Sequence, residues 1–124
     1  MKRILSLAAC LTLLCVGFAR SAEFKDDLTG VYRCEGQDYK GTTIIRRSGS
    51  AYQLLWSIGT QSHSGVGLVR GNYLSSSWSV NGKENVPGIV VYEIRPDRTL
   101  HGLYSSYPGG AVATEILTYQ APAN

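Results

Sequence analysis

The sequence predicts an all-β fold, a small antiparallel up-and-down barrel of about eight strands. Three observations support this class. Short runs in which apolar and polar residues alternate recur along 28–119, and such alternation is typical of half-buried strands. Turn-forming residues separate these runs at close spacing. No segment from Asp26 onward keeps the 3.6-residue period of a helix. Closure removes exposed strand edges, which favours a barrel over the alternative, a two-sheet β-sandwich.

The first three strands are expected at 28–36, 39–47 and 52–58. In the first, Tyr32 and Cys34 share one face, because side chains two positions apart point the same way. The third alternates most regularly, with its apolar face formed by these residues: Tyr52, Leu54, Trp56 and Ile58.

The next two strands are expected at 64–70 and 73–80, after a turn at 59–62. Gly65 and Gly67 lie on one face of the first of these two strands. Two glycines on one strand face suggest a bend, a bulge or the close approach of a neighbour. In the second strand, Leu74, Ser76, Trp78 and Val80 form one face.

The last three strands are expected at 88–95, 99–105 and 111–119. Residues 81–87 are then the longest polar connection between strands. The interior of a small eight-stranded barrel is either filled by side chains or wide enough for one small ligand. The sequence leaves that choice open.

The chain begins with the pattern of a secretory signal peptide. Lys2 and Arg3 precede an apolar run over 4–19, and the small-residue exit lies at 20–22. The run is short for a transmembrane helix, which needs about 20 apolar residues. We therefore expect a secreted or periplasmic protein that meets the membrane only transiently, through this signal peptide.

Cleavage is expected after Ser21, with Ala19 as the other acceptable site. This divides the chain into a signal peptide, 1–21, and a single soluble barrel domain, 22–124. The segment 7–10 also spells the lipobox that precedes a lipidated cysteine, here Cys10. The apolar run continues well past Cys10, which favours an ordinary signal-peptide cysteine and leaves lipidation as the alternative.

Removal of the signal peptide changes the charge balance. Three of the 12 basic residues leave with it, so nine basic residues face the 9 acidic ones. A neutral domain lacks the basic surface that nucleic acids and anionic membranes need, and neither is an expected partner. Cys34 is the one cysteine left, so no internal disulfide forms, and its apolar strand face favours a buried, inert thiol.

The chain offers no constellation typical of catalysis or metal binding. His63 and His101 are the two histidines, and neither has another ligand residue at metal spacing. We therefore expect no metal, no cofactor, no catalytic residue and no enzymatic activity. The carboxylates are scattered, and most are expected to be solvated: Glu35, Asp38, Glu84, Glu93, Asp97 and Glu115.

The aromatic residues are the main candidates for binding. Eight tyrosines and two tryptophans are many for a domain of this size, and tyrosine gives contact area at a low entropy cost. Trp56 and Trp78 lie on apolar strand faces and are expected in the core. Tyr73, Tyr104 and Tyr107 are the candidate binding residues at an exposed surface or a cavity mouth.

The pattern of glycines and aromatic residues carries a family resemblance. Gly30-x-Tyr32-x-Cys34, Tyr52-x-Leu54-x-Trp56 and the run 88–94 are similar to a family of small exported bacterial proteins, some of which are labelled fibronectin-binding. The opening Leu28-Thr29-Gly30-x-Tyr32 is also similar to the first-strand signature of lipocalins and avidins, with Tyr32 where tryptophan is usual. These resemblances imply an exported barrel and no particular site residue.

Three functions follow as hypotheses. The leading one is a non-enzymatic binding module for an extracellular protein or a small apolar ligand. The second is a small calycin-like enzyme that uses His63 or His101 with a carboxylate. The third is a structural envelope protein, which is expected if the barrel interior is completely filled.

Overall fold

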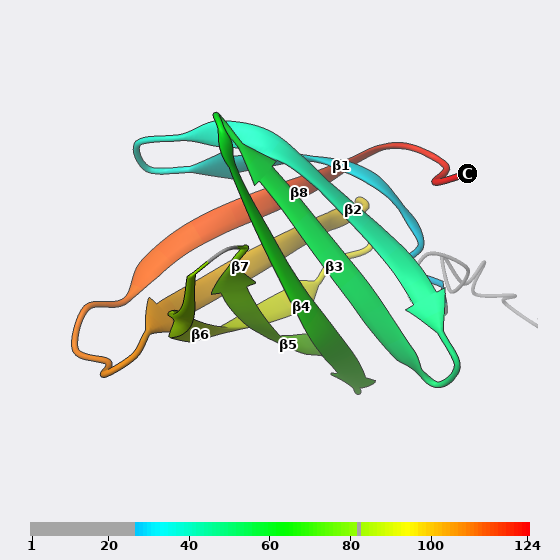
Figure 1. Cartoon of the computed structure of the whole chain (residues 1–124). Helices are drawn as coiled ribbons and strands as arrows, with labels where there is room; N and C mark the ends of the chain where they lie inside the picture. The colour runs from blue at the N-terminus through cyan, green and yellow to red at the C-terminus, as the bar shows by residue number, and fades with distance from the viewer. Residues whose placement is uncertain (1–26, 82) are drawn as a thin grey trace, which may run out of the picture.

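The computed structural model describes residues 27–81 and 83–124, which form a closed barrel of eight antiparallel strands in chain order (Figure 1). Each strand pairs with the next, and β8 pairs with β1. The strands are β1 (Gly30–Gly36), β2 (Lys40–Ser48), β3 (Ala51–Ile58), β4 (Gln61–Arg70), β5 (Tyr73–Val80), β6 (Lys83–Ile94), β7 (Thr99–Ser106) and β8 (Ala113–Ala121). This confirms the predicted barrel. The expected signal peptide and Cys10 lie outside the described residues.

Two predicted connections are wrong. β4 begins at Gln61, so the turn before it is shorter than expected. β6 begins at Lys83 instead of residue 88, and most of the expected polar connection belongs to this strand. A register shift after Ser79 explains the second difference. Such an irregularity lets a strand continue past Pro87, which has no N–H to donate.

The core lies inside the barrel and consists of the inward side chains of alternating positions. Tyr32 and Cys34 on β1 are fully buried, as are Leu54 on β3 and Leu74 on β5 to within 1%. These are the faces that the alternation predicted. Burial of apolar side chains on one face of each strand is the main force that fixes strand register.

The two inward glycines of β4 allow β5 to approach closely. A Cβ on Gly65 would lie 1.7 Å from the backbone oxygen of Ser77, and one on Gly67 would lie 2.9 Å from Cδ1 of Leu74. Of the three alternatives that these glycines suggested, the structure shows the close approach of a neighbouring strand.

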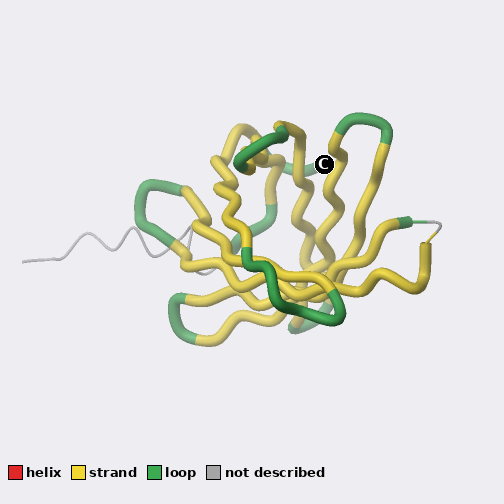
Figure 2. Tube along the Cα trace, turned by 90° about the vertical axis from the view of Figure 1, so that its left-hand side faces the viewer, coloured by secondary structure: helices red, strands yellow, loops and turns green. Residues whose placement is uncertain are grey.

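The strand connections divide between two ends of the barrel (Figure 2). The chain enters β1 at one end, and the C-terminus lies there too (Figure 1). Leu28 closes this end, because it is fully buried. Its carbonyl accepts a hydrogen bond from the Tyr32 hydroxyl at 2.7 Å, and its N–H donates to the Tyr52 hydroxyl at 3.4 Å. The connections β1–β2, β3–β4, β5–β6 and β7–β8 surround the other end.

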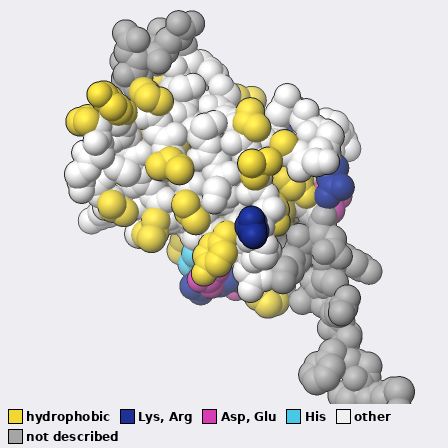
Figure 3. Space-filling model, turned by 90° about the horizontal axis from the view of Figure 1, so that it is seen from below, with side chains coloured by type: hydrophobic (Ala, Val, Ile, Leu, Met, Phe, Trp, Pro, Cys, Tyr) yellow, Lys and Arg dark blue, Asp and Glu magenta, His cyan; other side chains and the backbone are white. Residues whose placement is uncertain are grey.

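The outer surface carries several exposed hydrophobic side chains on β4, β6 and β7: Val66, Leu68, Ile89, Val91 and Leu103. On the face that Figure 3 shows, hydrophobic side chains stand in separate groups among polar ones. Within 27–81 and 83–124, no helix is long and apolar enough to cross a membrane.

Candidate functional site

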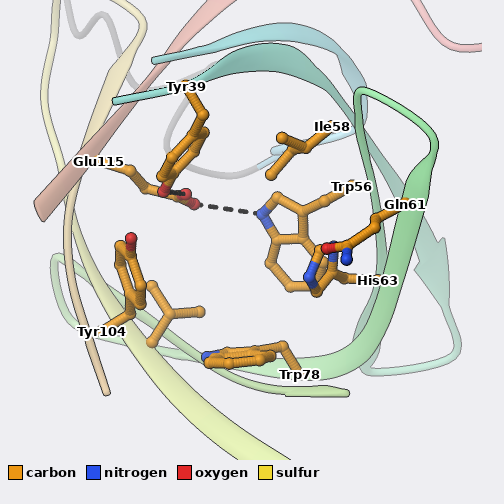
Figure 4. A pocket seen from close by; sticks show the side chains of 9 residues that line it. Tyr39, Trp56, Ile58, Gln61, His63, Trp78, Tyr104 and Glu115 are labelled. Atoms are coloured by element: carbon orange, nitrogen blue, oxygen red, sulfur yellow. Dashed lines mark hydrogen bonds between the residues drawn. The ribbon is translucent and has the colours of Figure 1, made fainter. Parts of the chain in front are cut away.

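A cavity of about 210 Å³ lies at the end of the barrel opposite Leu28. Side chains from six strands, β3 to β8, and from the β1–β2 connection enclose it (Figure 4). The lining residues are Tyr39, Trp56, Ile58, Gln61, His63, Trp78, Val90, Tyr104 and Glu115. The interior is therefore not completely filled. The hypothesis of a purely structural role required a completely filled interior.

Glu115 on β8 places a carboxylate in the wall of this cavity. Its side chain points inward on the same face as Leu117, and the residue is only 6% exposed. The expectation that most carboxylates are solvated is therefore wrong for Glu115. Four groups donate hydrogen bonds to its two oxygens: the Tyr92 hydroxyl, Nε1 of Trp56 at 3.2 Å, the Tyr39 hydroxyl at 2.6 Å and Sγ of Cys34 at 3.4 Å.

These four donors are electrically neutral. Oε1 accepts from Tyr92 and Trp56, while Oε2 accepts from Tyr39 and Cys34. The two ion pairs of the described chain lie on the surface, between Arg33 and Glu35 and between Arg95 and Glu93. Within the described residues, Glu115 thus has hydrogen-bond partners and no cationic one.

The environment keeps three of the donors protonated. Burial raises the pKa of Tyr92 well above its usual value, and the neighbouring Glu115 raises it further. The pKa of Tyr39 is raised for the same two reasons. Burial raises the pKa of the Cys34 thiol to about 12. Cys34 is fully buried, as predicted from the sequence.

Four rings form a continuous row around the cavity (Figure 4). We call this row the aromatic wall: Tyr39, Tyr104, Trp78 and His63. Consecutive rings meet edge to face. The centroid distances are 6.5 Å from Tyr39 to Tyr104, 6.3 Å from Tyr104 to Trp78 and 5.8 Å from Trp78 to His63. Aromatic pairs favour this geometry, so each ring of the wall is held in part by its neighbours.

Two glycines make room for rings of this wall. Gly88 on β6 pairs directly with Trp78 on β5, and a Cβ on Gly88 would lie 2.0 Å from Cε2 of the Trp78 ring. A Cβ on Gly36 would likewise lie 2.2 Å from the Tyr39 ring. Any larger residue at either position would displace its ring. The glycines therefore set how far these two rings extend from the barrel wall.

Two buried polar atoms in the cavity lining have no hydrogen-bond partner within the described structure: Nε1 of Trp78 and Nδ1 of His63. The indole N–H can only donate. Burial is the main cause that lowers the pKa of His63 below 6.5, which favours its neutral form. Such atoms are costly to bury without a partner.

The histidines do not form the pair that the enzyme hypothesis needs. His63 shares the cavity with Glu115, but no hydrogen bond joins them in the described structure. His101 lies outside the cavity lining and contacts Oγ1 of Thr99 at 3.1 Å. Across 27–81 and 83–124, no three His, Cys, Asp or Glu side chains gather to hold a metal ion.

The three candidate binding tyrosines lie in different places. Tyr104 belongs to the cavity lining. Tyr73, at the start of β5, is 52% exposed, and Tyr107, after β7, is 75% exposed; neither belongs to the cavity lining. Trp56 is in the core as predicted. Trp78 is only partly buried, because one side of its ring faces the cavity.

Sequence reasoning missed the roles of Tyr39 and Glu115. The sequence held one sign that Glu115 is buried. Glu115 shares a strand face with Ala113 and Leu117, and that face is otherwise apolar. An acid on such a face is a buried charge once the strand pairs. Tyr39 gave no such signal, because it lies in the connection before β2.

No protein-family model and no curated protein matches the sequence. Solved structures match its fold. A "REP1-NXSQ fatty acid transporter" is 13% identical with a TM-score of 0.55, over 79% of this chain and 99% of that one. A redesigned β barrel, mFAP1, bound to DFHBI is 15% identical with a TM-score of 0.59, over 81% and 99%.

A third similar structure is apo lipid binding protein 8 of Caenorhabditis elegans. It is 7% identical with a TM-score of 0.51, over 75% of this chain and 95% of that one. At these identities the likeness concerns the fold alone. It agrees with the closed barrel described above.

Proposed function

We propose that this protein binds one small, ring-bearing ligand in the cavity, mainly through apolar contacts with its ring, and has no catalytic role. The observation that carries the proposal is the cavity itself, which has an aromatic wall and two unpartnered polar atoms, Nε1 of Trp78 and Nδ1 of His63. Ligand sites are typically concave and apolar, with a few polar groups that fix orientation.

The size of the cavity indicates the size of the ligand. An engineered cavity of about 150 Å³ in another protein binds benzene, and this cavity measures about 210 Å³. A ligand with one ring and a short substituent fits such a space. A long acyl chain would extend beyond it.

The similar structures support the ligand-binding class. Their names describe a fatty acid transporter, a lipid binding protein and a barrel bound to DFHBI. We transfer from them only that proteins of this fold bind small molecules. An extracellular protein as partner is the less favoured alternative, because the cavity offers an enclosed, largely apolar site of the size of a small molecule.

We further propose that the protein is exported by its N-terminal segment and belongs to the exported bacterial family it resembles. Expression with the segment 1–21 intact should give a secreted or periplasmic protein that begins at Ala22. Mass spectrometry of the exported product tests this. A product that retains Met1 or that stays in the cytoplasm would contradict export.

A cavity-blocking variant tests ligand binding. Ile58 lines the cavity, so Ile58→Trp fills it and should abolish binding of 2-phenylethanol measured by calorimetry. Leu55→Trp is the matched control, since Leu55 lies on the same strand and faces outward with 36% exposure. The wild type and Leu55→Trp should bind the probe with equal affinity. Equal binding by Ile58→Trp would place the ligand elsewhere.

A further inference from the structure

The size of the cavity indicates the size of the ligand, and the charge of Glu115 indicates the charge of the ligand. This carboxylate is almost fully buried, accepts four hydrogen bonds from neutral donors and lines the cavity. A buried charge is costly unless an opposite charge compensates it. His63 lines the same cavity, but burial lowers its pKa below 6.5 even though Glu115 acts in the opposite direction. At neutral pH no side chain of the described residues therefore supplies that charge, and the cavity is the place from which a counter-ion can come.

The aromatic wall suits the same kind of partner. The faces of tyrosine and tryptophan rings carry negative electrostatic potential and attract organic cations. Tyr39, Tyr104 and Trp78 present such rings around the space that Glu115 faces (Figure 4). The Tyr39 hydroxyl lies 2.6 Å from a carboxylate oxygen, so this ring and the charge are immediate neighbours.

On the basis of the small-ligand function above, we propose that the cavity selects a ring-bearing organic cation, an arylalkyl ammonium, whose charge is balanced by Glu115 and the aromatic wall. The ring occupies the apolar space beside Val90 and Ile58, and the ammonium group lies toward the carboxylate. The donors to Glu115 need not move, because attraction between charges in a low-dielectric cavity does not require a direct hydrogen bond.

The same geometry disfavours carboxylic acids. An anionic ligand would bring a second negative charge beside Glu115, and like charges in a shared buried site repel. This chain therefore differs in ligand charge from the fatty acid transporter whose fold it shares.

Three probes of matched shape test the inference with the wild-type protein at neutral pH: 2-phenylethylammonium, 2-phenylethanol and phenylacetate. Calorimetry should show the ammonium binding at least about tenfold more tightly than the alcohol, and phenylacetate binding most weakly. Equal or tighter binding of the alcohol, or a preference for phenylacetate, would overturn the inference while leaving the small-ligand function intact. If none of the three probes binds, both proposals fail.

Variants then assign the preference to residues. Glu115→Gln should remove most of the preference for the ammonium, leaving only the part of about threefold that the aromatic wall supplies, and should leave alcohol binding nearly unchanged. Glu93→Gln is the control, because Glu93 lies on the outer surface with Arg95. Retention of the wild-type ratio by Glu115→Gln would overturn the assignment.

A second variant covers the case in which Glu115→Gln fails to fold. Trp78→Leu keeps an apolar side chain at the cavity wall and removes the ring face. It should weaken binding of the ammonium by at least about threefold more than binding of the alcohol. Equal loss for both probes would show that the aromatic wall acts only as apolar surface.

Discussion

Glu115 is a single buried acid on which four hydrogen bonds from distant parts of the chain converge. It is one of nine acidic residues in the chain. It lies two positions before the buried Leu117, on the same strand face, and therefore points toward the interior. The alternation alone could predict that direction. It could not predict the donors, because Tyr39, Trp56, Tyr92 and Cys34 reach Glu115 only through the pairing of distant strands.

His63 carries a prediction about pH. Burial lowers the pKa of folded His63 below its ordinary 6.5, so below pH 6.5 the unfolded chain binds more protons than the folded one. Stability should therefore fall as pH decreases from 6.5 through the folded pKa. Urea unfolding at pH 7.5 and 5.5 measures this loss, and His63→Gln should reduce it.

Two aspartates contribute to the pH dependence of stability in a more acidic range than His63. Hydrogen bonds to Thr29 and Thr99 lower the pKa values of Asp27 and Asp97 from 3.8, so their contribution to stability is lost only at more acidic pH. An identical loss between pH 7.5 and 5.5 in the wild type and His63→Gln would show that His63 is not responsible.

At the level of strands, periodicity predicted most of the barrel. The regular alternation of β3 and β5 fixed both their extent and their buried faces. The start of β6 was not predictable in this way, because a register shift beside Val80 and a proline inside the strand interrupt the pattern. Strand pairing beyond such an irregularity depends on the partner strand and not on local sequence.

The inward glycines of β4 give a prediction at this scale. Gly65→Ala should lower the free energy of unfolding by about 3 kcal/mol or more, because its Cβ would meet the backbone of β5, whereas Gly67→Ala should cost about 1 kcal/mol. Gly67 faces the ends of leucine side chains, which can move. Urea unfolding of both variants measures the difference, and equal losses would contradict this account of the close approach.

The barrel has two different ends: one is closed by Leu28, and the other holds the cavity. Leu28→Ala removes a fully buried side chain from the sealed end and should cost about 2–5 kcal/mol of stability. Because the cavity lies at the opposite end, affinity for 2-phenylethanol should stay unchanged. Thermal unfolding and calorimetry on the same variant measure both. Weakened binding in a folded Leu28→Ala protein would show that the two ends are coupled.

The hydrogen bonds to Glu115 have a mechanical consequence for the barrel as a whole. They tie β8 to β1, to the β1–β2 connection, to β3 and to β6 at a single depth. These hydrogen bonds therefore connect strands on opposite sides of the barrel through its interior and hold them at a fixed separation. This cross-bracing resists flattening of the barrel, so the space above it can persist while it is empty.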